Sequence, residues 1–131
     1  MEAKVLIVED EPIVAFEIED ILQEAGFEIV GCVGSLHKAL ATLKDTDCDV
    51  AVLDANLRGD SAAPVANALR ERGRPFLFVS GTERAHLPVG CLDVPLLSKP
   101  FEPGALIAAV SRLLSAARTS GDYSRSRSEP H

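Results

Sequence analysis

The sequence of 131 residues lacks both a surplus of basic side chains and a long apolar run. Its 13 lysines and arginines stand against 20 acidic residues, which gives a formal net charge of −7. Because binding to nucleic acid phosphates requires a basic surface, we expect no direct binding to nucleic acid. No apolar stretch reaches the roughly 18 to 20 residues that span a bilayer, and the N-terminus lacks a signal-peptide layout. We therefore expect a cytoplasmic protein with no membrane association.

Cysteine is scarce, and its placement argues against a disulfide framework or a thiolate metal site. The cysteines are far apart in the sequence and form no Cys-x-x-Cys pair; they are Cys32, Cys48 and Cys91. An odd number of widely separated cysteines is typical of free thiols in a reducing compartment. We expect these side chains to be buried free thiols.

The apolar content of the chain is sufficient for one compact domain with its own core. Hydrophobic residues make up 47% of the sequence, and a chain of this length fits a single folding unit. We place the domain at residues 1–117. Residues 118–131 are rich in serine and arginine and poor in apolar side chains, so we expect a disordered C-terminal tail there.

Short apolar runs alternate with segments of helical periodicity. The runs predict strands at residues 4–8, 28–33, 49–53, 75–79 and 94–98. Helices are predicted at residues 12–25, 36–43, 62–72 and 102–117. Between residues 81 and 93, Pro88 and Gly90 interrupt the helical pattern, so we expect a short or irregular helix. This alternation predicts an α/β fold, a flavodoxin-like doubly wound (βα)5 domain whose five-stranded parallel sheet has the order 2-1-3-4-5.

The first predicted helix has a clear beginning, a clear end and an apolar side. Pro12 suits the first helical turn, and Gly26 ends the helix. Apolar residues recur along it at helical spacing. They are Ile13, Phe16, Ile18, Ile21 and Leu22.

Polar side chains follow four of the five predicted strands at the point where each strand ends. Glu9, Asp10 and Glu11 follow the first strand, Asp54 the third, Ser80 the fourth and Lys99 the fifth. The carboxyl ends of parallel strands meet at one edge of a sheet, and a ligand crevice opens there where the strand order reverses. We therefore expect these side chains to converge at the crevice between the first and third strands.

The acidic residues at this crevice predict a magnesium site. Several carboxylates in one place repel one another, so a cation or bound protons must offset their charge. Magnesium prefers oxygen ligands, which Asp10 and Asp54 would supply directly and Glu9 through water. Calcium is disfavoured because the sequence has no 12-residue loop of alternating acids. A solvated acidic cap on the first helix is the alternative interpretation of residues 9–11.

Asp54 and Lys99 together favour chemistry on a phosphoryl group. A carboxylate can attack phosphorus to form an acyl phosphate when cations offset the charge of the incoming group. Lys99 would supply such a cation, and Ser80 would donate a hydrogen bond to a phosphoryl oxygen. The alternatives are turn-forming roles for Asp54 and Ser80 and a surface role for Lys99. Pro100 makes the preceding peptide bond a candidate for the cis form.

Four motifs stand at these strand ends, in this order: Val-Leu-Ile-Val-Glu9-Asp10-Glu11, Leu53-Asp54-Ala55-Asn56-Leu57, Val79-Ser80-Gly81 and Ser98-Lys99-Pro100-Phe101. Together they resemble the receiver domain of two-component response regulators, over roughly residues 3 to 117. The Pro-Phe-Leu-Phe-Val-Ser-Gly run at residues 75–81 is similar to the Pro-Phe-x-Phe-Ala-Thr-Gly-type fourth strand of alphaproteobacterial single-domain regulators.

The resemblance implies that Asp54 accepts a phosphoryl group and that the protein then binds a downstream protein target. The donor would be a histidine kinase, of the HWE or HisKA2 class, or a phosphotransfer protein. The resemblance also implies Mg²⁺ bound by Asp10, Asp54 and the backbone carbonyl of Asn56, with Glu9 assisting through water. Ser80 would sense the phosphoryl group and Lys99 would pair with it. Such a domain is a phosphoacceptor that assists only its own phosphorylation and dephosphorylation.

The resemblance is imperfect at the residue that usually transmits the signal. Many receivers carry a Tyr or Phe, which rotates inward with the Ser or Thr, where this sequence has Leu96. Phe101, which follows Pro100, is the alternative aromatic side chain for a switch with Ser80.

Other functions on the same fold stay open. The chain could be a binding module that acts without phosphorylation, or the receiver part of a longer regulator. A phosphatase of the haloacid-dehalogenase type would need a second acid where this sequence has Asn56. A flavin-binding module would place a phosphate next to residues 9–11, whose acidic side chains would repel it.

Overall fold

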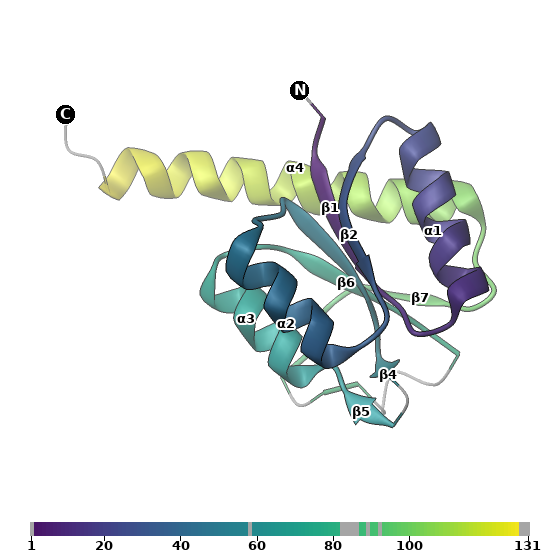
Figure 1. Ribbon diagram of the computed structural model, residues 1–131. Coiled ribbons are helices and arrows are strands. Elements are labelled where there is room, and N and C mark those ends of the chain that lie inside the picture. The colour runs from purple at the N-terminus through teal and green to yellow at the C-terminus, as the bar shows by residue number, and fades with distance from the viewer. Residues whose placement is uncertain (1, 58, 82–86, 89, 92, 129–131) are drawn as a thin grey trace.

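Five parallel strands form one sheet at the centre of the molecule (Figure 1). The computed structural model describes residues 2–57, 59–81, 87–88, 90–91 and 93–128. The sheet has the order β2-β1-β3-β6-β7, which is the predicted doubly wound order 2-1-3-4-5. Its strands are β1 (Lys4–Val8), β2 (Glu28–Val33), β3 (Val50–Asp54), β6 (Phe76–Ser80) and β7 (Leu96–Ser98). The predicted fold class is therefore confirmed.

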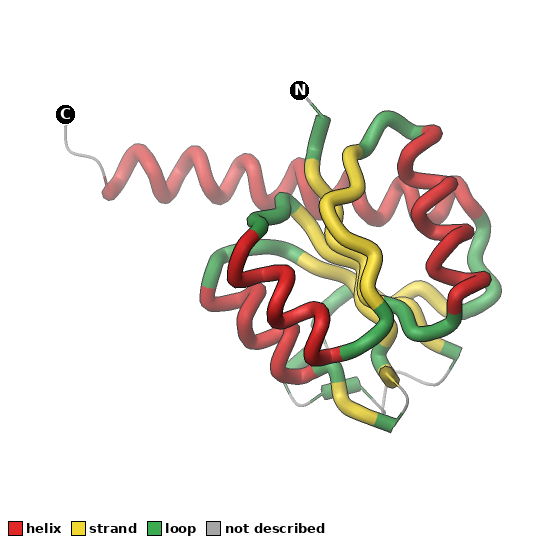
Figure 2. Tube along the Cα trace, in the orientation of Figure 1, coloured by secondary structure: helices red, strands yellow, loops and turns green. Residues whose placement is uncertain are grey.

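Helices cover both faces of the sheet, as Figure 2 shows with strands in yellow and helices in red. On one face lie α1 (Pro12–Glu24) and α4 (Pro103–Ser128), and on the other lie α2 (Leu36–Asp45) and α3 (Ala63–Glu71). The Ser35 side chain caps α2 as predicted, because its hydroxyl accepts a hydrogen bond of 3.1 Å from the Lys38 backbone N–H. Gly26, at a φ of 98°, ends α1. None of the helices in the described part of the chain is long and apolar enough to cross a membrane.

The core consists of two layers, one on each face of the sheet, because successive side chains of a strand point to opposite faces. In β1, Leu6 and Val8 pack with α2 and α3, whereas Val5 and Ile7 pack with α1 and α4. All four are essentially inaccessible to solvent. Strands buried on both faces must be apolar throughout, which is why the apolar runs predicted them so well.

The region between β3 and α3 contains a feature that the sequence did not predict. No strand or helix is predicted between residues 53 and 62, and the chain forms a short antiparallel pair there, β4 (Asn56–Leu57) with β5 (Asp60–Ser61). Leu57 is buried there, in the core layer of α2 and α3. Strands of two residues have no apolar periodicity, so nothing in the sequence pattern could indicate them.

The end of the sheet and the last helix also differ from the prediction. The last strand begins at Leu96 and not at residue 94, because Pro95 has no N–H to donate to a ladder. Helix α4 continues to Ser128, past the predicted end at 117, and its last turns extend beyond the sheet (Figure 1). A nucleated helix propagates until a breaker, and the next proline in the sequence is Pro130. Helix α4 thus includes residues of the predicted tail, and both the domain boundary at residue 117 and the disorder of residues 118–131 stay predictions. Most of the helix predicted at residues 81–93 lies outside the described residues.

Two apolar side chains of α1 and one of the cysteines expected to be buried are exposed. In α1, Ala15, Ile18 and Leu22 form the buried stripe, while the Ile13 and Phe16 side chains are 77% and 67% exposed. Both lie off that stripe at 100° per residue, although they recur at helical spacing with the buried residues of the same helix. Cys48 and Cys91 are buried free thiols as expected, but Cys32 is exposed because it lies on the edge strand β2.

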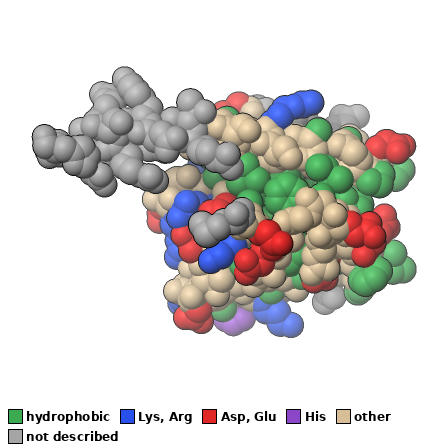
Figure 3. All heavy atoms as spheres, turned by 90° about the horizontal axis from the view of Figure 1, so that it is seen from above, with side chains coloured by type: hydrophobic (Ala, Val, Ile, Leu, Met, Phe, Trp, Pro, Cys, Tyr) green, Lys and Arg blue, Asp and Glu red, His purple; other side chains and the backbone are tan. Residues whose placement is uncertain are grey.

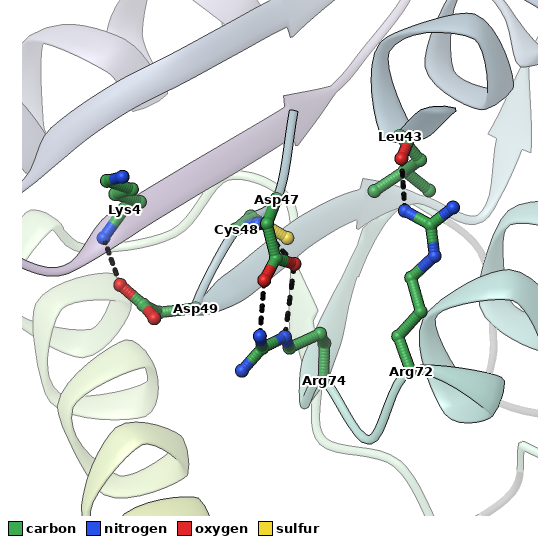
Figure 4. A network of polar contacts seen from close by, with 7 residues as sticks. All are labelled: Lys4, Leu43, Asp47, Cys48, Asp49, Arg72 and Arg74. Carbon is green, nitrogen blue, oxygen red and sulfur yellow. Dashed lines mark hydrogen bonds and ion pairs between the residues drawn. The ribbon is translucent and has the colours of Figure 1, made fainter. Parts of the chain in front are cut away.

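Opposite the strand ends that carry the acidic residues, polar contacts tie the connections of the fold together (Figure 4). The Lys4 backbone N–H donates a hydrogen bond of 2.7 Å to the Asp49 carboxylate. The Arg74 guanidinium pairs with Asp47 through two nitrogens, and Arg72 donates to the Leu43 carbonyl. On the face seen in Figure 3, acidic and basic side chains are interspersed around a hydrophobic area. The polar contacts drawn in Figure 4 lie away from the acidic crevice.

The layered core yields a test by side-chain truncation. We expect Phe78→Ala to lower the free energy of unfolding by about 3 to 5 kcal/mol, because it empties a fully buried position in the centre of the sheet. We expect Ile13→Ala to change it by less than about 0.5 kcal/mol, because Ile13 is exposed. Urea denaturation followed by circular dichroism measures both values. Equal losses in the two variants would contradict the assignment of the core.

Candidate functional site

The predicted site residues converge at the carboxyl edge of the sheet. Glu9 follows β1, Asp54 is the last residue of β3, Ser80 is the last of β6, and Lys99 follows β7. Glu9, Asp54 and Ser80 are the buried polar residues of the described chain, with exposed fractions of 3%, 5% and 2%. Buried polar groups are costly unless they are paired, so their collection at one edge indicates a site and not a general surface.

The Lys99 ammonium group is the centre of this site. Its Nζ lies 2.9 Å from Glu9 Oε1, 3.1 Å from Glu11 Oε1 and 3.4 Å from Asp54 Oδ2. The contacts with Glu11 and Asp54 are also hydrogen bonds that the ammonium donates. The sequence placed Lys99 and Asp54 together correctly, but it gave Glu11 no contact with Lys99. The one indication in the sequence that Glu11 belongs to the site was its position directly after Asp10.

Burial raises the pKa of the Glu9 carboxyl to about 7, and a hydrogen bond with Asp54 adds to the shift. Contact with Lys99 acts in the opposite direction, since a cation favours the charged carboxylate. For Lys99 itself, burial alone would lower the pKa, but the bond to Glu9 and the charge of Asp54 raise it above its ordinary value. The ammonium therefore stays charged, while Glu9 holds its proton unusually tightly.

The same edge offers a set of oxygen ligands for a cation. Carboxylate oxygens of Glu9, Asp10, Glu11 and Asp54 lie within 4.8 Å of one another. Glu9 Oε1 is buried and, within the part of the chain that the structure describes, accepts no hydrogen bond of regular geometry despite its ion pair with Lys99. A buried carboxylate oxygen that has an ion pair but no regular hydrogen bond, among hard oxygen donors, fits a divalent cation. Asn56 opens β4, two residues after Asp54.

Ser80 and Lys99 are joined through the backbone as well as by their place in the sheet. The Lys99 N–H donates a hydrogen bond of 2.9 Å to the Ser80 carbonyl, which continues the β6–β7 ladder into the site. The Lys99–Pro100 bond is cis, as the sequence suggested. Leu96, at the usual position of the switch aromatic, and Phe101, the alternative aromatic, lie on opposite faces of the sheet. Leu96 packs against the core layer of α2 and α3, and Phe101 packs against that of α1 and α4.

Comparison with known proteins assigns the family. The sequence profile of the response regulator receiver domain matches residues 5–111, which include the whole sheet except Lys4 and every predicted site residue. The chain therefore belongs to the response regulator receiver family, a family of signalling domains in two-component systems.

Three relatives illustrate the match. The BeF3-activated conformation of SdrG from Pseudomonas melonis Fr1 is 40% identical with a TM-score of 0.73, over 87% of this chain and 99% of that one. PhyR from Brucella abortus is 25% identical with a TM-score of 0.83, over 97% of this chain and 54% of PhyR. A protein-glutamate methylesterase/protein-glutamine glutaminase of Halobacterium salinarum is 29% identical over 88% of this chain. The chain spans only 38% of that enzyme's length.

The raised pKa of Glu9 predicts how stability depends on pH without divalent cations. A carboxyl whose pKa is higher in the folded state stabilises the fold fully below its ordinary value of 4.5, and the contribution is lost as pH rises through about 7. We therefore expect the free energy of unfolding, measured in EDTA, to fall over this range more steeply for the wild type than for Glu9→Gln.

The matched control for this prediction is Glu11→Gln. It also removes one carboxylate from Lys99, but it retains the buried acid at position 9. Urea denaturation at a series of pH values measures all three proteins. A Glu9→Gln variant with the same pH dependence as the wild type would contradict the role of Glu9.

Proposed function

We propose that the protein is a response regulator that accepts a phosphoryl group on Asp54 and signals by phosphorylation-dependent binding to another protein. The observation that carries the proposal is the ion pair of 3.4 Å between the buried Asp54 carboxylate and Lys99, within the acidic cluster at the strand ends. Membership in the receiver family supports it. So does the relative SdrG, which is described in a BeF3-activated conformation.

The chemistry follows from the residues around Asp54. An Asp54 carboxylate oxygen attacks the phosphorus of a phosphohistidine, a new O–P bond forms, and the N–P bond breaks so that its electron pair leaves with the imidazole. Lys99 offsets the negative charge of the incoming phosphoryl group. Asp10, Asp54 and the backbone carbonyl of Asn56 would hold Mg²⁺, with Glu9 acting through water. A bound Mg²⁺ ion supplies further positive charge for the phosphoryl oxygens.

Phosphorylation would change the site through the contacts of Lys99 and Ser80. A phosphoryl group adds a charge of about −1.5 to −2, which competes with Glu9 and Glu11 for the Lys99 ammonium. The Ser80 hydroxyl, at the end of the neighbouring strand, would donate to a phosphoryl oxygen. Both residues belong to the β6–β7 edge of the sheet, so the new charge acts on that edge first. Phe101, which follows Pro100, is the aromatic side chain that would respond with them.

The donor would be a histidine kinase, of the HWE or HisKA2 class, or a phosphotransfer protein. Such a donor must bring its histidine to Asp54, and two large apolar side chains are exposed next to the site. Ile13 and Phe16 are the exposed large hydrophobic side chains of the described chain, and they lie in the first turns of α1, directly after Glu11. Exposed apolar side chains beside a buried polar site favour a protein partner. We assign them to the docking surface for the donor.

The phosphoacceptor assignment is tested by intact mass. After incubation with Mg²⁺ and phosphoramidate, we expect one phosphoryl adduct on the wild type and none on Asp54→Asn, because the amide is not a nucleophile for phosphorus. The matched control is Asp49→Asn. Asp49 is an acid at the opposite end of the sheet, where it accepts a hydrogen bond from the Lys4 backbone N–H. An adduct on Asp54→Asn, or none on the wild type with any donor, would contradict the proposal.

The docking surface is tested separately from the chemistry. We expect Phe16→Ala to slow phosphoryl transfer from a histidine kinase active on the wild type by about tenfold or more, the effect of losing an aromatic contact in an interface. Uptake from phosphoramidate should not change, because that donor is too small to use the surface. Glu24→Ala, exposed at the far end of α1, is the control. Normal transfer from the kinase to Phe16→Ala would place the docking surface elsewhere.

A further inference from the structure

Arg70 joins α3 to the segment of chain that leads into β7. Its guanidinium donates a hydrogen bond of 2.7 Å from an Nη atom to the Gly90 carbonyl and lies 3.8 Å from Asp93 Oδ1. Its Cζ also lies 5.7 Å from the centre of the Phe76 ring, at the start of β6. One side chain therefore holds three separate parts of the molecule: α3, β6 and the residues before β7.

The backbone at Gly90 is suited to this contact. Gly90 has a φ of 85°, a conformation that side chains other than glycine rarely adopt. A Cβ atom at this position would lie 3.5 Å from the Arg70 guanidinium. On either side of it the chain is anchored in the core, because Leu87, Cys91 and Val94 are buried. The segment thus presents its carbonyl to Arg70 in a defined orientation.

Strand β7 needs such an anchor because it has little support of its own. It has three residues, lies at the edge of the sheet and pairs with β6 alone. Before β7, the Phe78 N–H donates a hydrogen bond of 2.9 Å to the Pro95 carbonyl. After β7, the Lys99 N–H donates a hydrogen bond of 2.9 Å to the Ser80 carbonyl. A displacement of Pro95 along β6 would therefore be passed through three residues to Lys99.

We infer that Arg70 is a positioning residue for Lys99, acting through the Gly90–Pro95 segment and β7. It does not touch the acidic crevice, and it sets where β7 begins on β6 and hence where the Lys99 ammonium meets its carboxylates. That this matters for phosphorylation rests on the proposed function. That Arg70 fixes β7 does not, and it can be measured without any phosphoryl donor.

The first test is amide hydrogen exchange by nuclear magnetic resonance on the unphosphorylated full chain. We expect Arg70→Ala to speed exchange of the Phe78, Val94 and Lys99 amides by roughly tenfold, since the loss of a charged hydrogen bond favours local opening. The Glu9 amide, which donates to the Val33 carbonyl between β1 and β2, should be unaffected.

Arg72→Ala is the matched control. Arg72 lies two residues further along and also donates to a backbone carbonyl, but to that of Leu43 at the end of α2 (Figure 4). Arg70→Lys keeps the charge and loses the planar fork of donors, so it should restore little of the protection. Exchange at Phe78, Val94 and Lys99 that is unchanged in Arg70→Ala, or equally fast in Arg72→Ala, would overturn the inference.

The second test connects the anchor to the site. We expect phosphoramidate to load Arg70→Ala several times more slowly than Arg72→Ala under conditions in which both are folded, because Lys99 is less often in place. A wild type that takes up no phosphoryl group would refute the proposed function and leave the exchange result standing. Faster exchange with normal loading would overturn the step from β7 to Lys99.

Discussion

The structure depends on one ammonium group that faces three carboxylates. Lys99 contacts Glu9, Glu11 and Asp54 within 3.4 Å, and two of these acids are almost completely buried. One cation cannot offset three anions, so the site is stable only with a proton on Glu9 or with further positive charge. Because carboxylates outnumber ammonium groups in this crevice, it suits a divalent cation. Under the proposed function, that cation would prepare Asp54 to accept a phosphoryl group, with which Lys99 would then pair.

The apolar core of the fold keeps these groups together at one edge of the sheet. The two core layers on either face of the sheet consist of apolar side chains from β1, β3 and β6 and from the four helices. Because the polar residues begin where the strands end, the core and the site do not compete for the same positions. Among the strands that lead to site residues, only β7 is both short and at the edge of the sheet, and Lys99 directly follows it. The contact of Arg70 with Gly90 compensates for this weakness.

The sequence predicted those features that depend on local patterns. Strands buried on both faces are apolar runs, and each site residue directly follows such a run, so the sheet order and the meeting of Asp54 with Lys99 could be inferred. The exposure of Ile13 and Phe16 could not be predicted, because an apolar residue at helical spacing does not reveal how wide the buried stripe is. The β4–β5 pair and the Arg70 contact join residues whose spacing in the sequence follows neither the helical nor the strand period. Contacts of this kind become visible only in three dimensions.

A crystal structure with Mg²⁺ and BeF₃⁻, a mimic of a phosphoryl group on a carboxylate, tests the central claim most directly. We predict density for a beryllium fluoride adduct on an Asp54 carboxylate oxygen, in contact with the Ser80 hydroxyl and Lys99 Nζ. We also predict that the Lys99 contacts to Glu9 and Glu11 lengthen. Density for the adduct on another residue would contradict the claim. So would an empty Asp54 with the ion pairs of Lys99 unchanged.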